Sequence, residues 1–543
     1  MMTVEVRALH VSLSDSGHGC TVAESRGHEG CTSTATHRRR RGLMPDTSPR
    51  RHHEIVIVGG GFSGLGTAIA LRKAGFDDLL IVDDGDGPGG TWQWNTYPGV
   101  AVDIPSFSYQ FSFAQRSTWS RSYAPGRELR AYAEQIVDEY GLAPHLQFGT
   151  RVHGASFDAP SATWSISTSA GDVTARWLIH AGGPLSQPKL PDIEGIDTFE
   201  GATMHTSRWN HEVSLAGKRV GIIGTGATAV QVVPEIAPEV DHLTVFQRTP
   251  IWCLPKPDFP LGRMGRASLE AVPGVRQIAR LASQAFVEAT FPVLAHFHKW
   301  VPATAALQVA ARRYIAAQVH DPATRDALTP TYALGCKRPS FHNSYLSTFN
   351  RDNVSLQTTS IEAITPGGIR TSDGVQHELD VLVLATGFKV TDRDALPTYP
   401  LTSADGTDLA EHWDAERFHT YQGVATAGFP NFFTVFGPYG YNGASFFTLV
   451  ENSAAHIVRV LTEARRRRAT FAEVTSAAQE QYMSAILARR SWQVFTDPTC
   501  AGANSYYFTA NGDVPFRAST TPEAAWRSRR FPLADYAFGG RAG

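Results

Sequence analysis

Two patterns of a buried strand, a glycine-rich turn and a helix stand out along the chain. The first is EIVIVGGGFSG at 54–64, where the apolar run Ile55–Val58 is typical of a strand buried in a parallel sheet. A helix pattern, TAIALRKAG, and a second apolar strand, LLIVDD, follow it. The second is RVGIIGTGATA at 219–229, followed by a helix pattern and the strand HLTVFQR. These alternations predict an α/β fold with two Rossmann-like domains.

The first turn has the spacing that brings the backbone close to a pyrophosphate. Gly59, Gly61 and Gly64 form G-x-G-x-x-G between a strand and a helix, and the helix N-terminus favours the negative charge of the phosphates. Asp83 ends the next strand, where a carboxylate accepts a bond from a ribose 2′-hydroxyl and repels a 2′-phosphate. This unit therefore suits FAD or NAD.

The second turn has the opposite charge at the equivalent place. Gly224 and Gly226 are followed by Ala229 in the third position, and the next strand ends at Arg248. A guanidinium suits a 2′-phosphate, so this unit favours NADP, although Arg248 as a plain surface arginine is the alternative. Two such units indicate electron transfer between cofactors. Because the chain contains no C-x-x-C, oxygen is the natural final acceptor.

The most apolar helical stretch, IARLASQAFVEATFPVLAHF, is interrupted by polar residues. Arg276, Arg280, Gln284 and Glu288 recur every four positions, which predicts one polar stripe on an amphipathic helix packed on the protein. Peripheral membrane contact is the alternative. No uninterrupted apolar run reaches the length of a membrane span, so no integral membrane segment is expected.

Composition narrows the possible partners. The 543 residues are 42% hydrophobic and 18% charged, with a net charge of −2, so the chain is an ordinary globular one without a field that attracts nucleic acid. The cysteines are odd in number and scattered, which argues against a disulfide scaffold and favours a reducing, cytoplasmic setting. They are Cys20, Cys31, Cys253, Cys336 and Cys500.

The first part of the chain differs from the rest. Residues 1–52 are rich in Ser, Thr, His and Gly and contain HRRRR at 37–41, a composition that predicts a disordered N-terminal extension. Met44 lies just before the folded part, so a start assigned too early is an equal alternative.

Three motifs then carry a resemblance to a known family. FEGATMHTSRWN matches F-x-G-x-x-x-H-x-x-x-W through Phe199, Gly201, His205 and Trp209. GGTWQWNTYPGVAVD matches a second signature, and GCKRP a third. Over about residues 53–540 the chain resembles the class B flavin monooxygenases, most closely the Baeyer–Villiger type. Asn210 departs from the Pro or Asp that usually ends the first signature.

The resemblance implies an NADPH- and FAD-dependent monooxygenase. NADPH reduces the flavin, oxygen forms a C4a-peroxyflavin, and one oxygen atom is inserted next to a carbonyl, which turns a ketone into an ester or lactone. The implied partners are molecular oxygen and a hydrophobic carbonyl compound, with a monomer or dimer as the assembly. Two alternatives are oxygenation of an amine or thioether and a non-catalytic, redox-sensing flavoprotein.

The resemblance also implies a division of the chain into domains. Residues 53–187 and 385–543 form a discontinuous FAD domain, which includes a C-terminal loop near substrate and cofactor. Residues 188–384 form an inserted NADPH domain with a helical subdomain at about 258–330. The crossovers between the domains are expected at 181–183 and 385–387.

Within these domains the resemblance assigns roles to individual residues. Arg338 is the catalytic cation beside the reacting oxygen, and Asp103 orients it; a surface basic pair and a turn cap are the alternatives. Lys337, Arg248 and Thr249 hold the NADP phosphate. Tyr506 stands where the family usually has tryptophan. The cofactor contacts implied are Gly59, Gly61, Gly64, Asp83, Gly90, Thr91, Trp92, Asp103, Tyr109, Val152, Gly224, Thr225, Gly226, Thr228, Ala229, Arg248, Thr249, Lys337 and Tyr506.

Three further expectations concern the surroundings of this site. Tyr97 is expected near the flavin, and the aromatic residues Tyr439, Tyr441, Phe446 and Phe447 are expected in the substrate pocket. No metal site is predicted, because no second ligand accompanies His205 at ligand spacing. In the linker, Phe199 and Trp209 are expected to pack a hinge, while His205 bonds across it.

Overall fold

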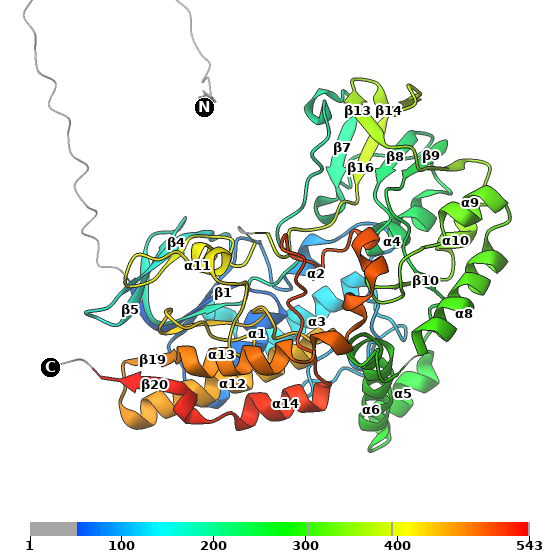
Figure 1. Ribbon diagram of the computed structural model, residues 1–543. Helices are drawn as coiled ribbons and strands as arrows, with labels where there is room; N and C mark the ends of the chain where they lie inside the picture. The colour runs from blue at the N-terminus through cyan, green and yellow to red at the C-terminus, as the bar shows by residue number, and fades with distance from the viewer. Residues whose placement is uncertain (1–50, 302, 393–394, 541–543) are drawn as a thin grey trace, which may run out of the picture. The chain divides into compact units, whose positions relative to one another are not determined.

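The computed structural model describes residues 51–301, 303–392 and 395–540, which belong to one compact unit (Figure 1). Strand β1 spans Arg51–Val58, so regular structure begins just before the boundary predicted at residue 52. The rest of the predicted N-terminal extension lies outside the described residues.

The larger sheet combines strands from two distant stretches of the chain. Its order is β17-β4-β5-β6-β1-β2-β3, and β18 also pairs with β6. β1 runs parallel to β2 and β6, whereas β4, β5 and β6 form an antiparallel run. Its other strands are β2 (Leu79–Val82), β3 (Leu146–Gln147), β4 (Val152–Asp158), β5 (Thr163–Thr168), β6 (Val173–His180), β17 (Leu401–Thr402) and β18 (Phe432–Thr434).

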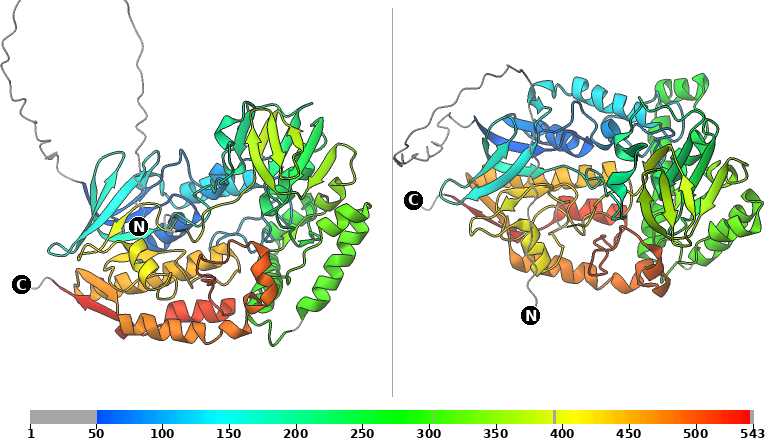
Figure 2. Two further views of the ribbon diagram at one scale, coloured as in Figure 1. Left: turned by 45° about the horizontal axis from the view of Figure 1, so that its top comes forward. Right: turned by 90° about the horizontal axis from the view of Figure 1, so that it is seen from above.

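The second sheet has five strands, all parallel, in the order β12-β9-β8-β16-β7. Its central strands are apolar and buried, as a sheet covered on both faces requires. The strands are β7 (Ala202–His205), β8 (Arg219–Ile223), β9 (His242–Phe246), β12 (Val354–Gln357) and β16 (Val381–Leu384). In Figure 2 these strands group with the green helical segments. The α/β fold with two Rossmann-like units is confirmed.

The remaining strands form small sheets of their own. β13 (Ile361–Thr365), β14 (Gly368–Thr371) and β15 (Gln376–Glu378) form an antiparallel sheet next in sequence to β12. β10 (Cys253–Leu254) pairs with β11 (Ser340–Phe341), and β19 (Phe471–Val474) pairs with β20 (Tyr536–Gly539).

The helices that accompany the larger sheet pack around one core. Leu65 of α1, Leu129 of α3 and Ile457 of α12 are fully buried in the same hydrophobic cluster, so three distant segments share that core. The helices are α1 (Phe62–Lys73), α2 (Thr91–Trp94), α3 (Gly126–Glu139), α11 (Leu409–Ala415), α12 (Phe446–Arg467), α13 (Ser476–Leu487) and α14 (Thr521–Arg530). Across the whole described chain, the 3-10 turns are η1 (Ala143–His145), η2 (Ile196–Thr198), η3 (Thr206–Arg208), η5 (Arg490–Trp492), η6 (Val494–Thr496), η7 (Pro498–Ala503) and η8 (Leu533–Asp535).

The stretch predicted as a helical subdomain is indeed rich in helix. It contains α5 (Arg263–Ala271), α6 (Val275–Glu288), the π-turn η4 (Ala289–Val293), α7 (Leu294–His296), α8 (Ala303–Gln318) and α9 (Pro322–Ala327). The remaining helices of the second unit are α4 (Ala227–Ile236) and α10 (Tyr345–Thr348).

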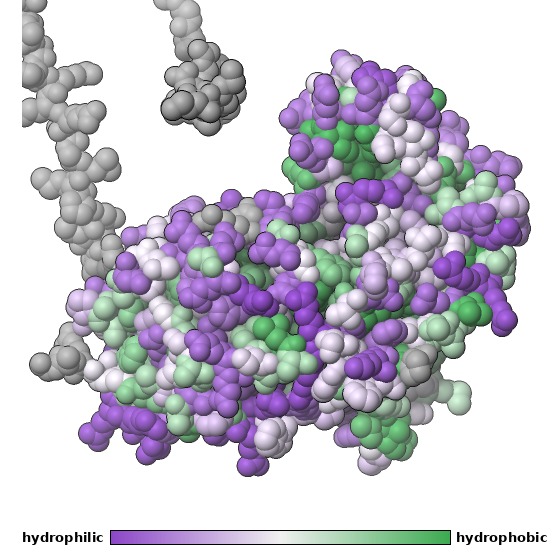
Figure 3. Space-filling view, in the orientation of Figure 1, coloured by the Kyte–Doolittle hydropathy of each residue, from purple (hydrophilic) through white to green (hydrophobic). Residues whose placement is uncertain are grey.

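Helix α6 packs on the protein as predicted, but through its polar stripe. Arg280 is buried and donates to the carbonyl of Gln110 at 2.9 Å, and Arg276 donates to the carbonyl of Gln115 at 3.2 Å. Ile278 and Leu281 are instead 68% and 69% exposed, and Figure 3 shows apolar surface over α5 and α6 at its lower right. The backbone carbonyls beneath the helix need donors, and the arginines supply them.

The cysteine pattern argued against a disulfide scaffold, but the structure contains one disulfide. Cys336 and Cys500 form a disulfide with a Cα–Cα distance of 5.1 Å across a sequence separation of 164. Such a pair leaves no local pattern in the sequence, because only the folded chain brings the two residues together. Among the described helices, none is both long and apolar enough to cross a membrane.

Candidate active site

The first glycine turn is shaped so that only glycine fits. Gly59 has φ +120°, and a Cβ on it would lie 2.5 Å from the carbonyl oxygen of Ala181. A Cβ on Gly64 would lie 1.9 Å from the carbonyl oxygen of Gly59. Gly61 caps α1 without any side-chain bond to the helix N-terminus, and no acidic residue lies in the first turn. The amide groups there are thus available to an anion, which fits the pyrophosphate of a dinucleotide.

Asp83 lies at the end of β2 beside this turn. It accepts the N–H groups of Gly60 at 2.5 Å and Gly85 at 2.7 Å. Burial raises its pKa, and the two backbone bonds partly offset that rise. One carboxylate therefore fixes the turn and also faces the cavity that begins here.

A cavity of about 590 Å³ extends from this turn to Arg338. Trp92 and Tyr109 meet edge to face on its wall, with ring centroids 5.7 Å apart. Twelve of the residues assigned from the sequence line it: Gly59, Gly61, Asp83, Gly90, Thr91, Trp92, Asp103, Tyr109, Val152, Thr228, Arg338 and Tyr506. The structure thus brings the glycine turn, the G-G-T-W segment and the basic segment into one space.

Arg338 and Asp103 form a bidentate ion pair on this cavity. Arg338 donates from Nε to Oδ2 at 2.6 Å and from Nη2 to Oδ1 at 3.0 Å. The two side chains are 22% and 31% exposed. Burial would raise the pKa of Asp103, but the charge and hydrogen bonds of Arg338 outweigh it and lower that pKa. The pKa of Arg338 is in turn raised well above its usual value despite burial. Both groups are therefore charged at neutral pH.

Aromatic hydroxyls surround this pair. Tyr441, Tyr506 and Tyr507 line the cavity together with Arg338, and burial raises the pKa of Tyr441 to about 12. The phenols are neutral at neutral pH, so Arg338 keeps its positive charge uncompensated except by Asp103. The cation therefore has one fixed carboxylate partner and a neutral aromatic surround.

Two of the predicted pocket residues lie elsewhere. Tyr439 donates its hydroxyl to Asp513 at 2.8 Å and is not part of the cavity lining. Phe447 is fully buried, with its ring 4.7 Å from that of Phe62. Phe446 and Tyr441 line the cavity as predicted. Phe447 turns inward because it follows Phe446 in the first turn of α12, where neighbouring side chains point to different faces.

The second glycine turn repeats the geometry of the first. Gly224 has φ +115°, and a Cβ there would lie 2.5 Å from the carbonyl oxygen of Ala385. Gly226 precedes α4, again with no side-chain cap on the helix N-terminus. Thr225 donates its hydroxyl to the carbonyl of Thr249 at 2.9 Å, and Ala229 is buried in α4. This turn also fits a dinucleotide phosphate.

Two cations, Arg248 and Lys337, lie close enough for their charges to interact. Burial lowers the pKa of Lys337 to about 8, and the positive charge of Arg248 contributes to that shift. Arg248 itself is exposed. Seven of the assigned residues belong to this second group and are not on the cavity wall: Gly224, Thr225, Gly226, Ala229, Arg248, Thr249 and Lys337.

Sequence reasoning missed two residues that connect these groups. Gln231 on α4 accepts the hydroxyl of Tyr97 at 3.0 Å and donates to the carbonyl of Ala101 at 2.9 Å. Its position three residues after Thr228 on one helix face was the available signal. The charge of Lys256 helps to lower the pKa of Asp103, and no sequence pattern marked it. Tyr97 lines the cavity as expected and is also tied to the second unit.

In the linker 199–210, His205 makes a local hydrogen bond in addition to its contacts with the second crossover. His205 bonds through Nδ1 to Ser207 within its own turn, and its ring meets Phe388 edge to face at 6.0 Å. It therefore meets the second crossover through the ring of Phe388 and through the backbone of Gly387, whose hydrogen bond opposes the lowering of the His205 pKa. Burial lowers the pKa of His205 to about 4, so it is neutral. Asn210, the residue that departs from the signature, accepts the N–H of Glu212 at 2.9 Å. Its side chain therefore stabilises a turn.

The two crossovers lie against each other at the cavity. Pro188 and Phe388 form an antiparallel bridge, and Lys189 donates its N–H to the carbonyl of Gly387 at 2.9 Å. The cavity lining includes Gly182 and Phe388. Both connections between the sheets therefore pass the site.

Comparison with known proteins identifies close relatives. Residues 56–261 match the family described as pyridine nucleotide-disulphide oxidoreductase. A Baeyer-Villiger monooxygenase of Streptomyces coelicolor is 36% identical over 89% of this chain and 92% of its own length. The closed crystal structure of cyclohexanone monooxygenase aligns with 30% identity and a TM-score of 0.81, covering 91% of this chain and all of that one. The structure of OTEMO in complex with FAD and NADP aligns with 29% identity and a TM-score of 0.80, over 90% of this chain and all of its own.

Proposed function

Because this chain belongs to the Baeyer–Villiger monooxygenase family, we propose that Arg338 and Asp103 serve its oxygen insertion and that its substrate is a hydrophobic, aryl-bearing ketone. The enzyme is an FAD-containing monooxygenase that uses NADPH and O2 to insert one oxygen next to a carbonyl. Oxygenation of an amine or thioether is less well supported, because the relatives above are named for Baeyer–Villiger and ketone chemistry.

One observation carries the proposed catalytic role: the bidentate pair lies on the same cavity as the first glycine turn. FAD, when bound, supplies the activation of oxygen. Arg338 then holds the negative charge that develops on the substrate carbonyl oxygen during addition. Asp103 keeps the guanidinium oriented and balances its charge. An arginine suits this role because it stays protonated at every working pH.

The FAD contacts that we propose follow the wall of this cavity. The open N-terminus of α1 holds the pyrophosphate, and Asp83 accepts a ribose hydroxyl. Gly90, Thr91, Trp92, Tyr109 and Val152 contact the remaining part of the flavin. Gly64 acts indirectly, because its missing Cβ lets the helix approach the strand.

The NADPH contacts that we propose lie around the second turn. The pyrophosphate rests on Gly224, Thr225, Gly226 and the start of α4, which carries Thr228 and Ala229. Arg248, Thr249 and Lys337 surround the 2′-phosphate, supported by the shared field of the two cations. Tyr506 closes over the nicotinamide end from the other side of the cavity.

We propose the corresponding domain division. The FAD domain comprises 53–187 and 385–543, supported by the single sheet that contains strands from both stretches. The NADPH domain comprises 188–384 with a helical subdomain at about 258–330, supported by the five-stranded parallel sheet and helices α5 to α9. The dependence on NADPH supports a cytoplasmic setting for the enzyme.

The substrate class rests on the residues near Arg338. Beyond the flavin contacts, the cavity wall is aromatic, with Phe436, Tyr441, Phe446, Tyr507 and Phe516. Acetophenone is expected to exceed 2-butanone in kcat/KM by at least about tenfold, a 1.4 kcal/mol difference. Burying an aromatic group yields about 1.5–3 kcal/mol, which is enough to produce that ratio.

Steady-state assays with gas chromatography of the products measure this ratio, with thioanisole as the comparison substrate. Sulfoxide from thioanisole without ester from any ketone would overturn the proposed function. Equal efficiency for the two ketones would overturn the substrate class alone.

The lowered pKa of Lys337 predicts a pH dependence for the use of NADPH. Below about pH 8 the ammonium is charged and attracts the 2′-phosphate; above it the group loses its proton. The kcat/KM for NADPH is therefore expected to fall as the pH rises through about 8. Loss of one charged contact is of the order of a tenfold effect.

The matched control is Lys337→Arg, which keeps its charge through this range and should flatten the profile. NADH, which has no 2′-phosphate, should show no such fall with the wild-type enzyme. An identical pH profile for wild type and Lys337→Arg would contradict the assignment.

A further inference from the structure

The disulfide joins two segments of the cavity wall. Cys336 is immediately followed by Lys337 and Arg338, and Cys500 lies in η7, six positions before Tyr506. Arg338, Tyr506 and Tyr507 all line the cavity. A covalent bond thus connects the segment that carries the catalytic cation to the segment that carries the aromatic residues facing it.

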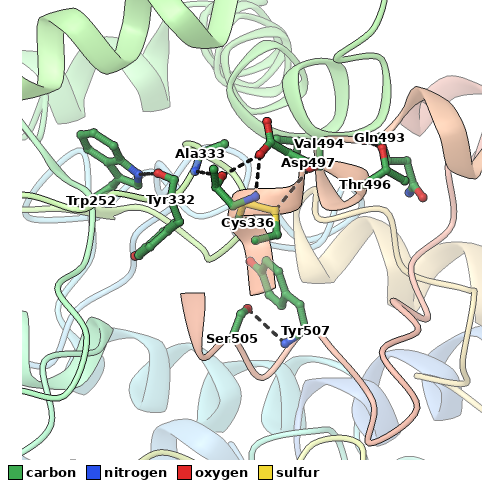
Figure 4. Close-up of a disulfide and its surroundings, with 12 residues drawn as sticks. Trp252, Tyr332, Ala333, Cys336, Gln493, Val494, Thr496, Asp497, Ser505 and Tyr507 are labelled. Atoms are coloured by element: carbon green, nitrogen blue, oxygen red, sulfur yellow. Dashed lines mark hydrogen bonds between the residues drawn. A yellow bond between two sulfur atoms is a disulfide. The ribbon is translucent and has the colours of Figure 1, made fainter. Parts of the chain in front are cut away.

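Both sulfur-bearing residues lie inside the protein. Cys336 is 0% and Cys500 3% exposed, and both belong to the same hydrophobic cluster as Tyr507 and Val494. Figure 4 shows the bond between these segments with Tyr507 close to it. A Cβ on Gly335 would lie 3.0 Å from Val494. The two segments therefore pack tightly at the bond.

Residues 490–508 are held by core packing and short turns, and no strand of a sheet runs through them. Residues 490–503 form three short 3-10 turns, and no strand ties them to a sheet. Thr499 accepts the N–H of Ala333 at 2.9 Å, and Asn504 donates to the hydroxyl of Thr249 at 2.6 Å. The side chain of Tyr506 is 46% exposed. Because no strand fixes this segment, the covalent bond at Cys500 restrains its position in addition to the packing of Phe495 and Tyr507 in the core.

We propose that Cys336 and Cys500 are positioning residues for the oxygenation reaction. Their bond holds residues 498–508 against the Arg338 segment, so that Tyr506 and Tyr507 stay over the cavity while substrate reacts. Opening the bond lets this wall move away and admits water. NADPH is then still oxidised, but most of the oxygen is released as hydrogen peroxide and little ester forms. This inference rests on the proposed role of Arg338.

Two routes open the bond in the full-length enzyme. One is the double variant Cys336→Ser/Cys500→Ser. The other is a phosphine reductant, which takes up the oxygen of one water molecule as phosphine oxide while the disulfide gains two electrons and two protons to give two thiols. Cys253→Ser is the matched control, because Cys253 is a buried free cysteine of the same hydrophobic cluster.

The readouts are ester formed per NADPH consumed, hydrogen peroxide released, and the KM for NADPH. Opening the bond by either route is expected to lower the ester yield per NADPH by up to about 100-fold, since a displacement of about 1 Å can cost that much. NADPH oxidation should continue, and the reductant should have no further effect on the double variant. Cys253→Ser should behave as wild type.

Peptide mapping after alkylation and hydrogen exchange of residues 498–508 give readouts that need no oxygenation activity. The proposal predicts a linked Cys336–Cys500 peptide pair and faster exchange in 498–508 once the bond opens. The proposal would be overturned if peptide mapping shows that the disulfide is open while hydrogen exchange and the ester yield per NADPH are unchanged. Alkylated thiols at both positions in untreated enzyme would also overturn it. If the wild-type enzyme oxygenates no ketone, the proposed role of Arg338 fails. Hydrogen exchange of residues 498–508 then still shows whether the disulfide restrains this segment. If the double variant does not fold, the reduced wild type supplies the same comparison.

Discussion

Replacing Arg338 with alanine is expected nearly to abolish ester formation while NADPH oxidation continues. Arg338 is held by Asp103 through two bonds of 2.6 and 3.0 Å on the cavity that the flavin is proposed to enter. Its loss removes the cation that is proposed to stabilise charge on the reacting carbonyl oxygen, and removing one such donor typically costs about 3–4 kcal/mol, a factor of about 10²–10³. It also leaves the partly buried Asp103 without its guanidinium partner, which adds to the loss.

Two variants sharpen this result. Arg338→Lys keeps a positive charge without the planar fork, so partial ester formation is expected. Arg370→Ala removes an exposed arginine that pairs with Glu362 at 2.9 Å and should leave activity unchanged. Product analysis and NADPH consumption, measured together, separate oxygenation from flavin reduction. Ester formation by Arg338→Ala at close to the wild-type rate would refute the role assigned to this residue.

Gly64→Ala is expected to yield protein without FAD. The added Cβ would lie 1.9 Å from the carbonyl oxygen of Gly59, and a backbone atom inside α1 and its turn cannot move aside as a flexible side chain can. The turn must deform, and overpacking of this kind costs about 1–3 kcal/mol or more. Because the deformed atoms belong to the turn that is proposed to receive the pyrophosphate, flavin loading is expected to be lost first.

The matched change at the second turn is Gly226→Ala. Its Cβ would meet no atom within 4 Å, so the protein should fold and retain its flavin, with any effect confined to NADPH. Flavin absorbance per protein, measured on both purified variants, gives the comparison. A fully flavinated Gly64→Ala would contradict the proposed fit of FAD to this turn.

The parts of the fold that sequence predicts well are local ones. The two glycine turns depend on neighbouring strands and helices, and both lie where the sequence placed them, each at an uncapped helix N-terminus. The pairing of Arg338 with Asp103 was reached through family resemblance, since residues so far apart in sequence carry no joint pattern. The roles of the remaining cofactor residues stay predictions.

The parts that sequence predicts poorly depend on distant neighbours. Helix α6 has the predicted polar stripe, but periodicity does not show which face of the helix packs against the protein. The backbone carbonyls of Gln110 and Gln115 accept hydrogen bonds from Arg280 and Arg276, so the polar face packs inward. The bond between Cys336 and Cys500 has the same cause, because cysteine count and spacing do not reveal contacts made by the fold. Tyr439 was assigned to the pocket by composition, but a nearby acceptor, Asp513, directs its hydroxyl elsewhere.

The origin of the oxygen in the product tests most directly whether the enzyme inserts an oxygen atom from O2 next to a carbonyl. The full-length chain with FAD and NADPH is incubated with acetophenone under ¹⁸O₂, and the product is analysed by mass spectrometry. The expected product is an ester that carries one labelled oxygen, in the position between the carbonyl carbon and the migrated group, with one NADPH consumed per ester in a coupled reaction. Unlabelled ester, or consumption of NADPH with no ester from any ketone tested, would contradict this oxygen insertion.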